Sequence, residues 1–179
     1  DLYGRMWIFS RLWSPGQTLT ISFLNGNEWQ RLKVKQYAAE WTKHANIRFL
    51  FVEKSNEVAD IRVGFNFKND STSWSKIGKD ALVVPPAHPT IHFGWIEPGK
   101  TEGEIRRVIL HEFGHLLGLQ HELQSPASRH DWDKDALHQY YLKTAGWTQD
   151  QVDFNVLNKL DTDFFSDFDP LSIMAYSVA

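Results

Sequence analysis

Cysteine is absent from this chain of 179 residues, and so are long apolar runs and any excess of basic residues. Without cysteine no disulfide can form, which leaves the cellular compartment open. No apolar stretch approaches the roughly 18 residues that a membrane span requires. The net charge of −3 and the lack of a basic run argue against a nucleic-acid-binding surface. We therefore expect neither a nucleic acid partner nor a membrane span.

The composition is that of a folded domain, with 42% hydrophobic and 14% aromatic residues. A chain of this length can bury a sizeable core, so we expect one domain over residues 1–179. The first residue is Asp1, and the residues after it resemble neither a signal peptide nor an initiator-Met start. We expect a processed or trimmed form of a protein that is secreted or delivered outside the producing cell.

The most informative stretch runs from His111 to Glu122 and reads HEFGHLLGLQHE. On an α-helix, residues four apart lie about 40° from each other, so His111 and His115 share one face and can bind one ion. Glycine tolerates the left-handed conformation that ends helices, so Gly118 can let the chain leave the helix and return with His121. The spacing predicts a zinc site with three histidine ligands.

Three neutral nitrogen ligands leave one position of a tetrahedral Zn²⁺ open for water and lower the pKa of that water toward about 7. Glu112 lies about 100° round the helix from His111, beside the metal face, where it is placed as a general base. The competing interpretation is a buried helix whose histidines are satisfied by hydrogen bonds. The full pattern makes a zinc-dependent hydrolase the better interpretation.

The helix that carries the motif also has its own start signal. Thr101 and Glu104 form a capping-box sequence, which predicts a helix from about Glu102 to Leu117. Its apolar residues fill an arc opposite the two histidines and would pack on a core; they are Ile105, Ile109, Leu110, Phe113, Leu116 and Leu117.

Apolar alternation and turn residues predict an α+β fold with a twisted mixed sheet of about five strands and two long helices. The expected strands are Thr18 to Leu24, Ile47 to Val52, Asp60 to Phe65, Ala81 to Val84 and Thr90 to Ile96, with a helix from Glu28 to about His44 after the first. Proline follows Val84, so the fourth strand is expected at a sheet edge. Residues 66–80 are expected to form a loop.

The chain changes character after His121, where a polar loop is followed by two short predicted helices. They run from about Lys134 to Thr144 and from about Gln149 to Leu157, the second opened by a capping box at Thr148. We infer an upper lobe over about residues 1–118, a smaller lobe of helices and loops over about 119–179, and an active-site cleft between them.

The last segment contains Ser172-Ile173-Met174-Ala175-Tyr176. Together with HExxHxxGxxH, this segment resembles the methionine turn of the metzincin zinc peptidases, and Glu122 directly after the third histidine is closest to the astacin-like branch. The serralysin branch shares a tyrosine after its methionine and remains a candidate. The resemblance implies a metzincin-like fold with Met174 as the floor under the ligand histidines and Tyr176 as a switch tyrosine that swings to the reaction centre.

Physical chemistry allows other roles for these residues. Met174 could be ordinary core packing, and Tyr176 could pack near the end of the chain with its hydroxyl in water instead of donating to an oxyanion. Glu122 could pair with a cation or the amino terminus, or it could be a solvated carboxylate. Gly118, Met174 and Glu122 are therefore predicted as structural support, whereas Glu112 and Tyr176 are predicted as catalytic.

The chain also departs from the pattern of the astacin-like enzymes, which usually carry disulfides, so we expect either a divergent, microbial member or a protein that works where thiols stay reduced. The other histidines lack ligand spacing and are expected to be structural or on the surface; they are His44, His88, His92, His130 and His138. A group of aspartates lacks the glycine and terminal glutamate of a calcium-binding loop and is expected to be solvated; it comprises Asp161, Asp163, Asp167 and Asp169.

These observations predict a zinc endopeptidase that cleaves internal peptide bonds of a polypeptide, with a propeptide or inhibitor as a candidate further partner. An extended substrate would pair with the expected edge strand, formed by Ala81, Leu82, Val83 and Val84. Two alternatives remain: a zinc hydrolase of a non-peptide amide, and an inactive zinc-containing binding or toxin module. Structural zinc sites are normally closed by four protein ligands, which disfavours the second alternative.

Overall fold

The computed structural model describes residues 11–53, 58–160 and 165–176. The chain divides into two compact units, one ending at Gly118 and the other starting at Leu119. In the described residues, no helix has both the length and the apolar character needed to cross a bilayer. The expectation of a single catalytic domain with a cleft between two lobes stays a prediction.

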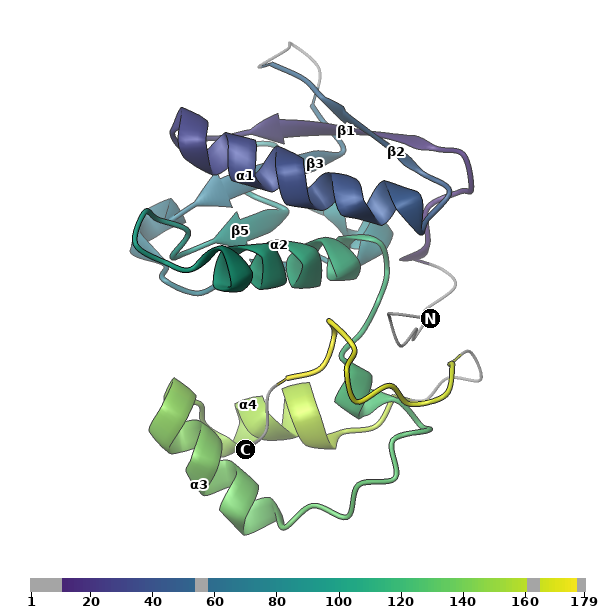
Figure 1. The fold of residues 1–179 in the computed structure, drawn as a ribbon, viewed down its shortest axis with the longest axis vertical. Helices are drawn as coiled ribbons and strands as arrows, with labels where there is room; N and C mark the ends of the chain where they lie inside the picture. Colours follow the sequence, from purple (N-terminus) through teal and green to yellow (C-terminus); the bar gives the residue numbers. More distant parts are fainter. Residues whose placement is uncertain (1–10, 54–57, 161–164, 177–179) are drawn as a thin grey trace. The chain divides into compact units, whose positions relative to one another are not determined.

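The unit that ends at Gly118 is built on a five-stranded mixed sheet with the strand order β2-β1-β3-β5-β4 (Figure 1). The strands β2, β1, β3 and β5 are parallel, and β4 is an antiparallel strand at the edge next to β5. The strands are β1 (Thr18–Phe23), β2 (Arg48–Phe51), β3 (Ile61–Phe65), β4 (Trp74–Ser75) and β5 (Ile91–Phe93). The predicted α+β class and mixed sheet of about five strands are confirmed.

Two helices cover one face of this sheet (Figure 1): α1 (Glu28–Ala38), which continues as a 3₁₀ turn over Ala39–Lys43, and α2 (Glu102–Leu116). Both begin with a capping box, at Asn27 for α1 and, as predicted, at Thr101 for α2. The indole of Trp41 donates to the carbonyl of Leu110 at 3.0 Å, and Glu102 accepts from both Lys33 and Tyr37. The two helices are therefore joined at both ends of their contact.

The core under α2 is apolar and closely filled. Its fully buried side chains come from the strands and from the face of α2 opposite the histidines, and they include Leu19, Ile21, Ile61, Val63, Ile91, Ile105, Ile109 and Phe113. Burying a side chain of this kind contributes about 1.5–3 kcal/mol, so α2 is held on the sheet along its whole length. The metal-binding face of the helix is thus carried by a rigid element.

The prediction of an edge strand from Ala81 to Val84 is wrong, because Gly78–Val83 forms a 3₁₀ helix. The N–H of Val84 donates back to the carbonyl of Ala81, and the guanidinium of Arg62 on β3 donates to the carbonyl of Val84 at 2.8 Å. These bonds use the polar groups that a strand would need for its ladder. The periodicity of a four-residue apolar run cannot distinguish a strand from a helix, and in this protein the run is helical.

The true edge strand, β4, lies inside the stretch that the sequence predicted as a loop. Its signal is weak because it has only two residues and follows three residues with positive φ, namely Asn66, Lys68 and Asn69. Trp74 fixes the strand by donating from its indole to Asp70 at 2.9 Å and by stacking on His92.

The unit that starts at Leu119 contains a 3₁₀ turn (Glu122–Gln124), α3 (Lys134–Ala145) and α4 (Gln149–Val152), which continues as a π-helical turn over Asp153–Leu157. Asp133 caps α3, and Gly146 ends it with φ +68°. Thr148 then opens α4 with a capping box. Both short helices are thus close to their predicted bounds. They pack around a small core of Leu123, Leu137, Tyr141, Val152 and Val156.

Candidate metal centre

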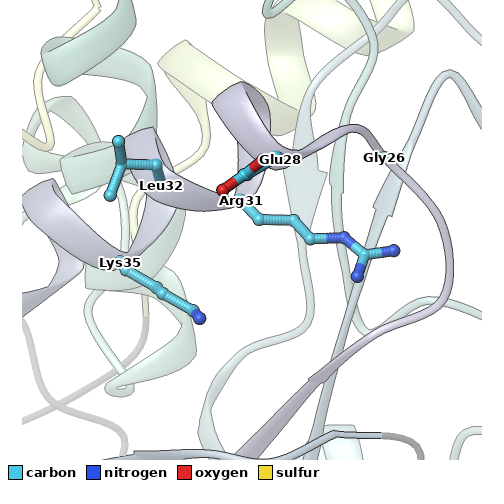
Figure 2. A pocket seen from close by; sticks show the side chains of 5 residues that line it. All are labelled: Gly26, Glu28, Arg31, Leu32 and Lys35. Carbon is cyan, nitrogen blue, oxygen red and sulfur yellow. The ribbon is translucent and has the colours of Figure 1, made fainter.

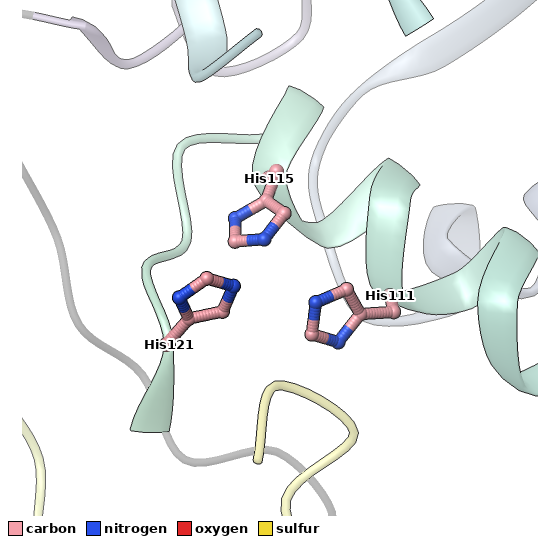
Figure 3. A group of neighbouring side chains, drawn as sticks. All are labelled: His111, His115 and His121. Carbon is pink, nitrogen blue, oxygen red and sulfur yellow. The ribbon is translucent and has the colours of Figure 1, made fainter. Parts of the chain in front are cut away.

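The helix α2 presents His111 and His115 from the same face, one turn apart, as the sequence predicts. Both side chains are buried, and their ring centroids lie 4.8 Å apart with the ring planes nearly perpendicular at 89°. The two rings are arranged edge-to-face. One ring nitrogen of His111 and one of His115 are therefore directed toward the space beside the helix (Figure 3). The helix supplies two ligand positions without distortion.

Gly118 redirects the chain after α2 so that His121 returns toward the first two histidines (Figure 3). Its φ of +103° is a conformation that other residues rarely adopt. A Cβ at this position would also meet the Cδ2 atom of Leu12 at 2.6 Å, so glycine is required for space as well as for conformation. The helix ends at Leu116, close to its predicted end.

The ligand atoms of His111, His115 and His121 all lie within 4.8 Å of one another. All three side chains are buried, and in the part of the chain that the structure describes they are the only group of three or more such residues able to hold a metal ion. Three imidazole nitrogens without a carboxylate or thiolate suit Zn²⁺ and leave a coordination position for water or substrate. The donor set therefore fits zinc.

Glu112 lies next to His111 on α2 and is almost fully buried, with 6% of its surface exposed. Its Oε2 atom has no hydrogen-bond partner among the described residues. Burial raises the pKa of Glu112 to about 8, because the charged carboxylate loses its hydration. A buried carboxylate oxygen without a hydrogen bond is costly for folding, and such costs are typical of groups at functional sites.

Met174 and Tyr176 lie on the turn after Asp169. Met174 is fully buried, and its carbonyl accepts the N–H of Glu122 at 3.0 Å. The ring of Tyr176 lies on that of His121, with 4.4 Å between centroids and a tilt of 50°. The structure thus brings Tyr176 to a predicted zinc ligand. The role of Met174 as a floor under the histidines stays a prediction.

Glu122 is buried to 2% exposure, so the interpretation as a solvated carboxylate is wrong. Its Oε1 atom accepts the N–H of Asp169 at 3.0 Å, and its own N–H donates to the carbonyl of Met174. Burial raises the pKa of Glu122, while hydrogen bonds from the backbone of Asp169 and the side chain of Ser172 act in the opposite direction. Pairing with the amino terminus stays a prediction, because Asp1 lies outside the described residues.

The residues predicted to bind substrate do not form the expected strand. Ala81 is fully buried, whereas Val83 is 84% exposed and Leu82 is 53% exposed. The structure does not offer Ala81 to Val84 as a strand with which a substrate could pair, since the N–H of Val84 donates to the carbonyl of Ala81 within the 3₁₀ turn.

Other histidines have partners that suit a structural role. His92 is fully buried, accepts the N–H of Phe67 at Nε2 and donates from Nδ1 to the carbonyl of Thr72, both at 2.8 Å. His138 contacts the carboxylate of Asp153 at 2.7 Å. Two of the four aspartates considered for calcium, Asp161 and Asp163, lie outside the described residues.

A surface pocket of about 450 Å³ lies beside α1 (Figure 2), lined by Gly26, Glu28, Arg31, Leu32 and Lys35. Arg31 and Lys35 lie over the ring of Phe23 at 5.5 and 5.9 Å from its centroid. That ring stacks on Phe51 at the ends of adjacent strands. The two cations cover the aromatic end of the sheet, and the pocket has neither the histidines nor the buried carboxylate of the metal centre.

Comparison with known proteins adds a family and a fold. The family model for Matrixin matches residues 13–160. One structure of myroilysin is 37% identical, covers 96% of this chain and 82% of its own, and has a TM-score of 0.88. A crystal structure of myroilysin, also 37% identical, covers 96% of this chain and 74% of its own with a TM-score of 0.70.

A more distant match shares the fold alone. It is high choriolytic enzyme 1, a hatching enzyme zinc-protease from the medaka fish Oryzias latipes, which is 20% identical, covers 96% of this chain and 76% of its own, and has a TM-score of 0.57. No curated protein sequence matches the chain. The fold and the peptidase resemblance inferred from the sequence are confirmed, and the branch within the family is not distinguished.

Proposed function

The chain belongs to the matrixin family of zinc metallopeptidases, and from this premise we propose that it cleaves internal peptide bonds with Glu112 as base and Tyr176 as oxyanion donor. The observation that carries the proposal is the buried carboxylate of Glu112, whose Oε2 atom has no hydrogen-bond partner among the described residues, next to the histidine cluster. The substrate of such an enzyme is a polypeptide. His111, His115 and His121 would hold the zinc ion.

Bound zinc supplies a Lewis acid, which polarises the scissile carbonyl and makes a neighbouring water more acidic. Glu112 accepts a proton from the attacking water at its carboxylate, and the water oxygen bonds to the carbonyl carbon. Tyr176 donates its hydroxyl proton in a hydrogen bond to the carbonyl oxygen as negative charge develops there. Glu112 then passes its proton to the amide nitrogen, the C–N bond breaks, and the amine leaves.

We place the enzyme in the astacin-like branch. The support is Glu122 directly after the third histidine, together with the Ser-Ile-Met-x-Tyr segment that Glu122 contacts through Asp169 and Met174. Control by a propeptide or inhibitor and action outside the producing cell complete the proposal. Recovery of the protein only from inside the producing cells would contradict the proposed site of action.

The proposal predicts that Glu112→Gln keeps the metal and loses turnover. The amide has nearly the same shape but cannot accept the proton, so cleavage of an unfolded protein should fall by about 10³-fold or more. Zinc content, measured by mass spectrometry, should stay near one ion per chain. Glu97→Gln, which changes an exposed carboxylate, is the matched control. Near-normal turnover in Glu112→Gln would remove Glu112 as the base.

For Tyr176→Phe, kcat should fall about 10- to 100-fold while KM changes less than about twofold, because the lost hydrogen bond forms only as the oxyanion develops. Tyr140→Phe removes a hydroxyl from the same unit and should leave kcat unchanged. Steady-state kinetics on a peptide substrate measures both values. An unchanged kcat in Tyr176→Phe excludes the tyrosine from the mechanism.

A further inference from the structure

The ring of Tyr176 is surrounded by three other rings within the unit that starts at Leu119. It lies on His121 at 4.4 Å between centroids, meets the indole of Trp147 edge-to-face at 5.3 Å and 86°, and contacts Tyr141 at 6.5 Å and 76°. Trp147 in turn stacks on Tyr141 at 5.0 Å with only 11° between the ring planes. The four rings form a continuous contact path from α3 to the third histidine, which we call the aromatic bracket: Tyr141, Trp147, Tyr176 and His121.

Trp147 has an unusually constrained backbone for a residue between two helices. Gly146 ends α3 in the left-handed conformation, and Thr148 is the N-cap of α4, so Trp147 is the single residue between two caps. Its own N–H donates to the carbonyl of Tyr141 at 3.2 Å. The backbone therefore fixes the direction in which the indole leaves the chain.

Tyr141, at the α3 end of the aromatic bracket, is also fixed in position. Tyr141 is 5% exposed and belongs to the apolar core of this unit, against which Trp147 and Tyr176 pack. Edge-to-face and stacked aromatic pairs each contribute about 0.5–1.5 kcal/mol beyond the area they bury. One such contact, the stack on Tyr141, holds the indole, and a second, edge-to-face, supports one side of the Tyr176 ring.

We propose that Trp147 is a positioning residue for Tyr176: its indole holds the phenol ring against His121, where the hydroxyl can act. This inference rests on the proposed function of Tyr176 and adds a residue that no sequence motif points to. Loss of the indole removes one of the contacts that hold the phenol ring against His121, so the ring samples more positions. A shift of about 1 Å in a reacting group can cost about 10²-fold in rate, so the effect should appear in kcat more than in KM.

The test compares Trp147→Ala and Trp147→Phe in the wild-type and in the Tyr176→Phe backgrounds. In the wild type, Trp147→Ala should lower kcat about tenfold with KM changed less than about twofold, and Trp147→Phe should recover most of the loss because it keeps a ring. In the Tyr176→Phe background, the same two changes should lower kcat less than about twofold further, since the hydroxyl is already gone. Zinc content should be the same in all variants.

Trp132→Ala is the matched control, because Trp132 packs against the same core and has no ring contact with Tyr176 among the described residues. It should leave kcat within about twofold of the wild type. An unchanged kcat in Trp147→Ala, an equal loss in both backgrounds, or a loss that follows zinc content overturns the proposal. If Trp147→Ala does not fold, Trp147→Leu, which keeps an apolar side chain but has no ring, is compared in the two backgrounds instead, with the same expected and contradicting outcomes. If Tyr176→Phe by itself leaves kcat unchanged, the proposed role of the tyrosine is wrong. This outcome differs from a failure of the aromatic bracket, in which Tyr176→Phe lowers kcat and Trp147→Ala does not.

Discussion

At the scale of single residues, buried charges define both the chemistry and the loop geometry of this protein. Glu112 is buried without a hydrogen bond at Oε2, beside the metal ligands. Arg62 is buried on β3 and donates to three carbonyls, those of Ala59, Val84 and His88. The first group is the proposed general base, and the second holds the chain after the 3₁₀ helix in place.

Arg62→Lys should lower the free energy of unfolding by about 2–4 kcal/mol. A single ammonium group cannot reach three carbonyls that a planar guanidinium fork spans. The hydrogen bond to Ala59 is buried and those to Val84 and His88 are partly buried, and a buried acceptor left unpaired costs about 1–3 kcal/mol. Urea denaturation measures the change, and Arg48→Lys on the exposed side of β2 is the control. A difference from the control below about 0.5 kcal/mol would show that the three hydrogen bonds contribute little.

At the scale of secondary structure, the sequence predicts elements that depend on neighbouring residues and does not predict those that depend on residues distant in the chain. The capping residues Asn27, Thr101 and Thr148 act through neighbours three residues away, so the sequence identifies them directly. The segment from Ala81 to Val84 was misassigned because its conformation depends on Arg62, which is distant in sequence. The two-residue strand β4 was missed because its pairing partner on β5, not its own composition, defines it.

Gly118→Ala should weaken zinc binding as well as stability, because the turn it allows brings His121 to the two histidines of α2. The positive φ makes alanine unfavourable by about 1–2 kcal/mol, and the added methyl meets the side chain of Leu12. Gly99→Ala is a close control, since Gly99 has φ +106° but open space around it. Both variants should lose stability, and only Gly118→Ala should lose zinc affinity in a chelator competition assay.

At the scale of the whole molecule, stability, metal binding and pH should be linked through Glu112. Without bound metal its pKa of about 8 lies above the unfolded value of about 4.5, so the folded state holds more protons between these pH values. Stability contributed by this group is therefore lost as pH rises from about 5 to 8. The cationic zinc favours the carboxylate and opposes this loss.

Chelator-treated protein should accordingly melt at a lower temperature at pH 8 than at pH 5.5, and zinc should raise the melting temperature more at pH 8. Glu112→Gln should flatten the pH dependence of the chelated protein, because the amide does not titrate. Differential scanning calorimetry at the two pH values measures this. An identical pH dependence in wild type and Glu112→Gln would show that other groups, such as the ligand histidines, cause it.

The metal motif was predictable because its ligands lie within eleven consecutive positions, from His111 to His121. The burial of Glu122 was not, because its partner Asp169 is 47 residues away in the chain. The aromatic bracket was missed for the same reason, since Trp147 and Tyr176 come together only through the packing of α3 and α4.

The contacts of Glu122 also bear on how this chain can vary in length. Its carboxylate accepts the N–H of Asp169, and its own N–H donates to the carbonyl of Met174. The segment from Leu123 to Phe168 therefore begins and ends next to the same residue, Glu122. The entropy cost of closing a segment grows only slowly with its length. Insertions in the loops of this segment, outside α3, α4 and Trp147, should therefore cost little folding free energy and leave the geometry of the three histidines unchanged.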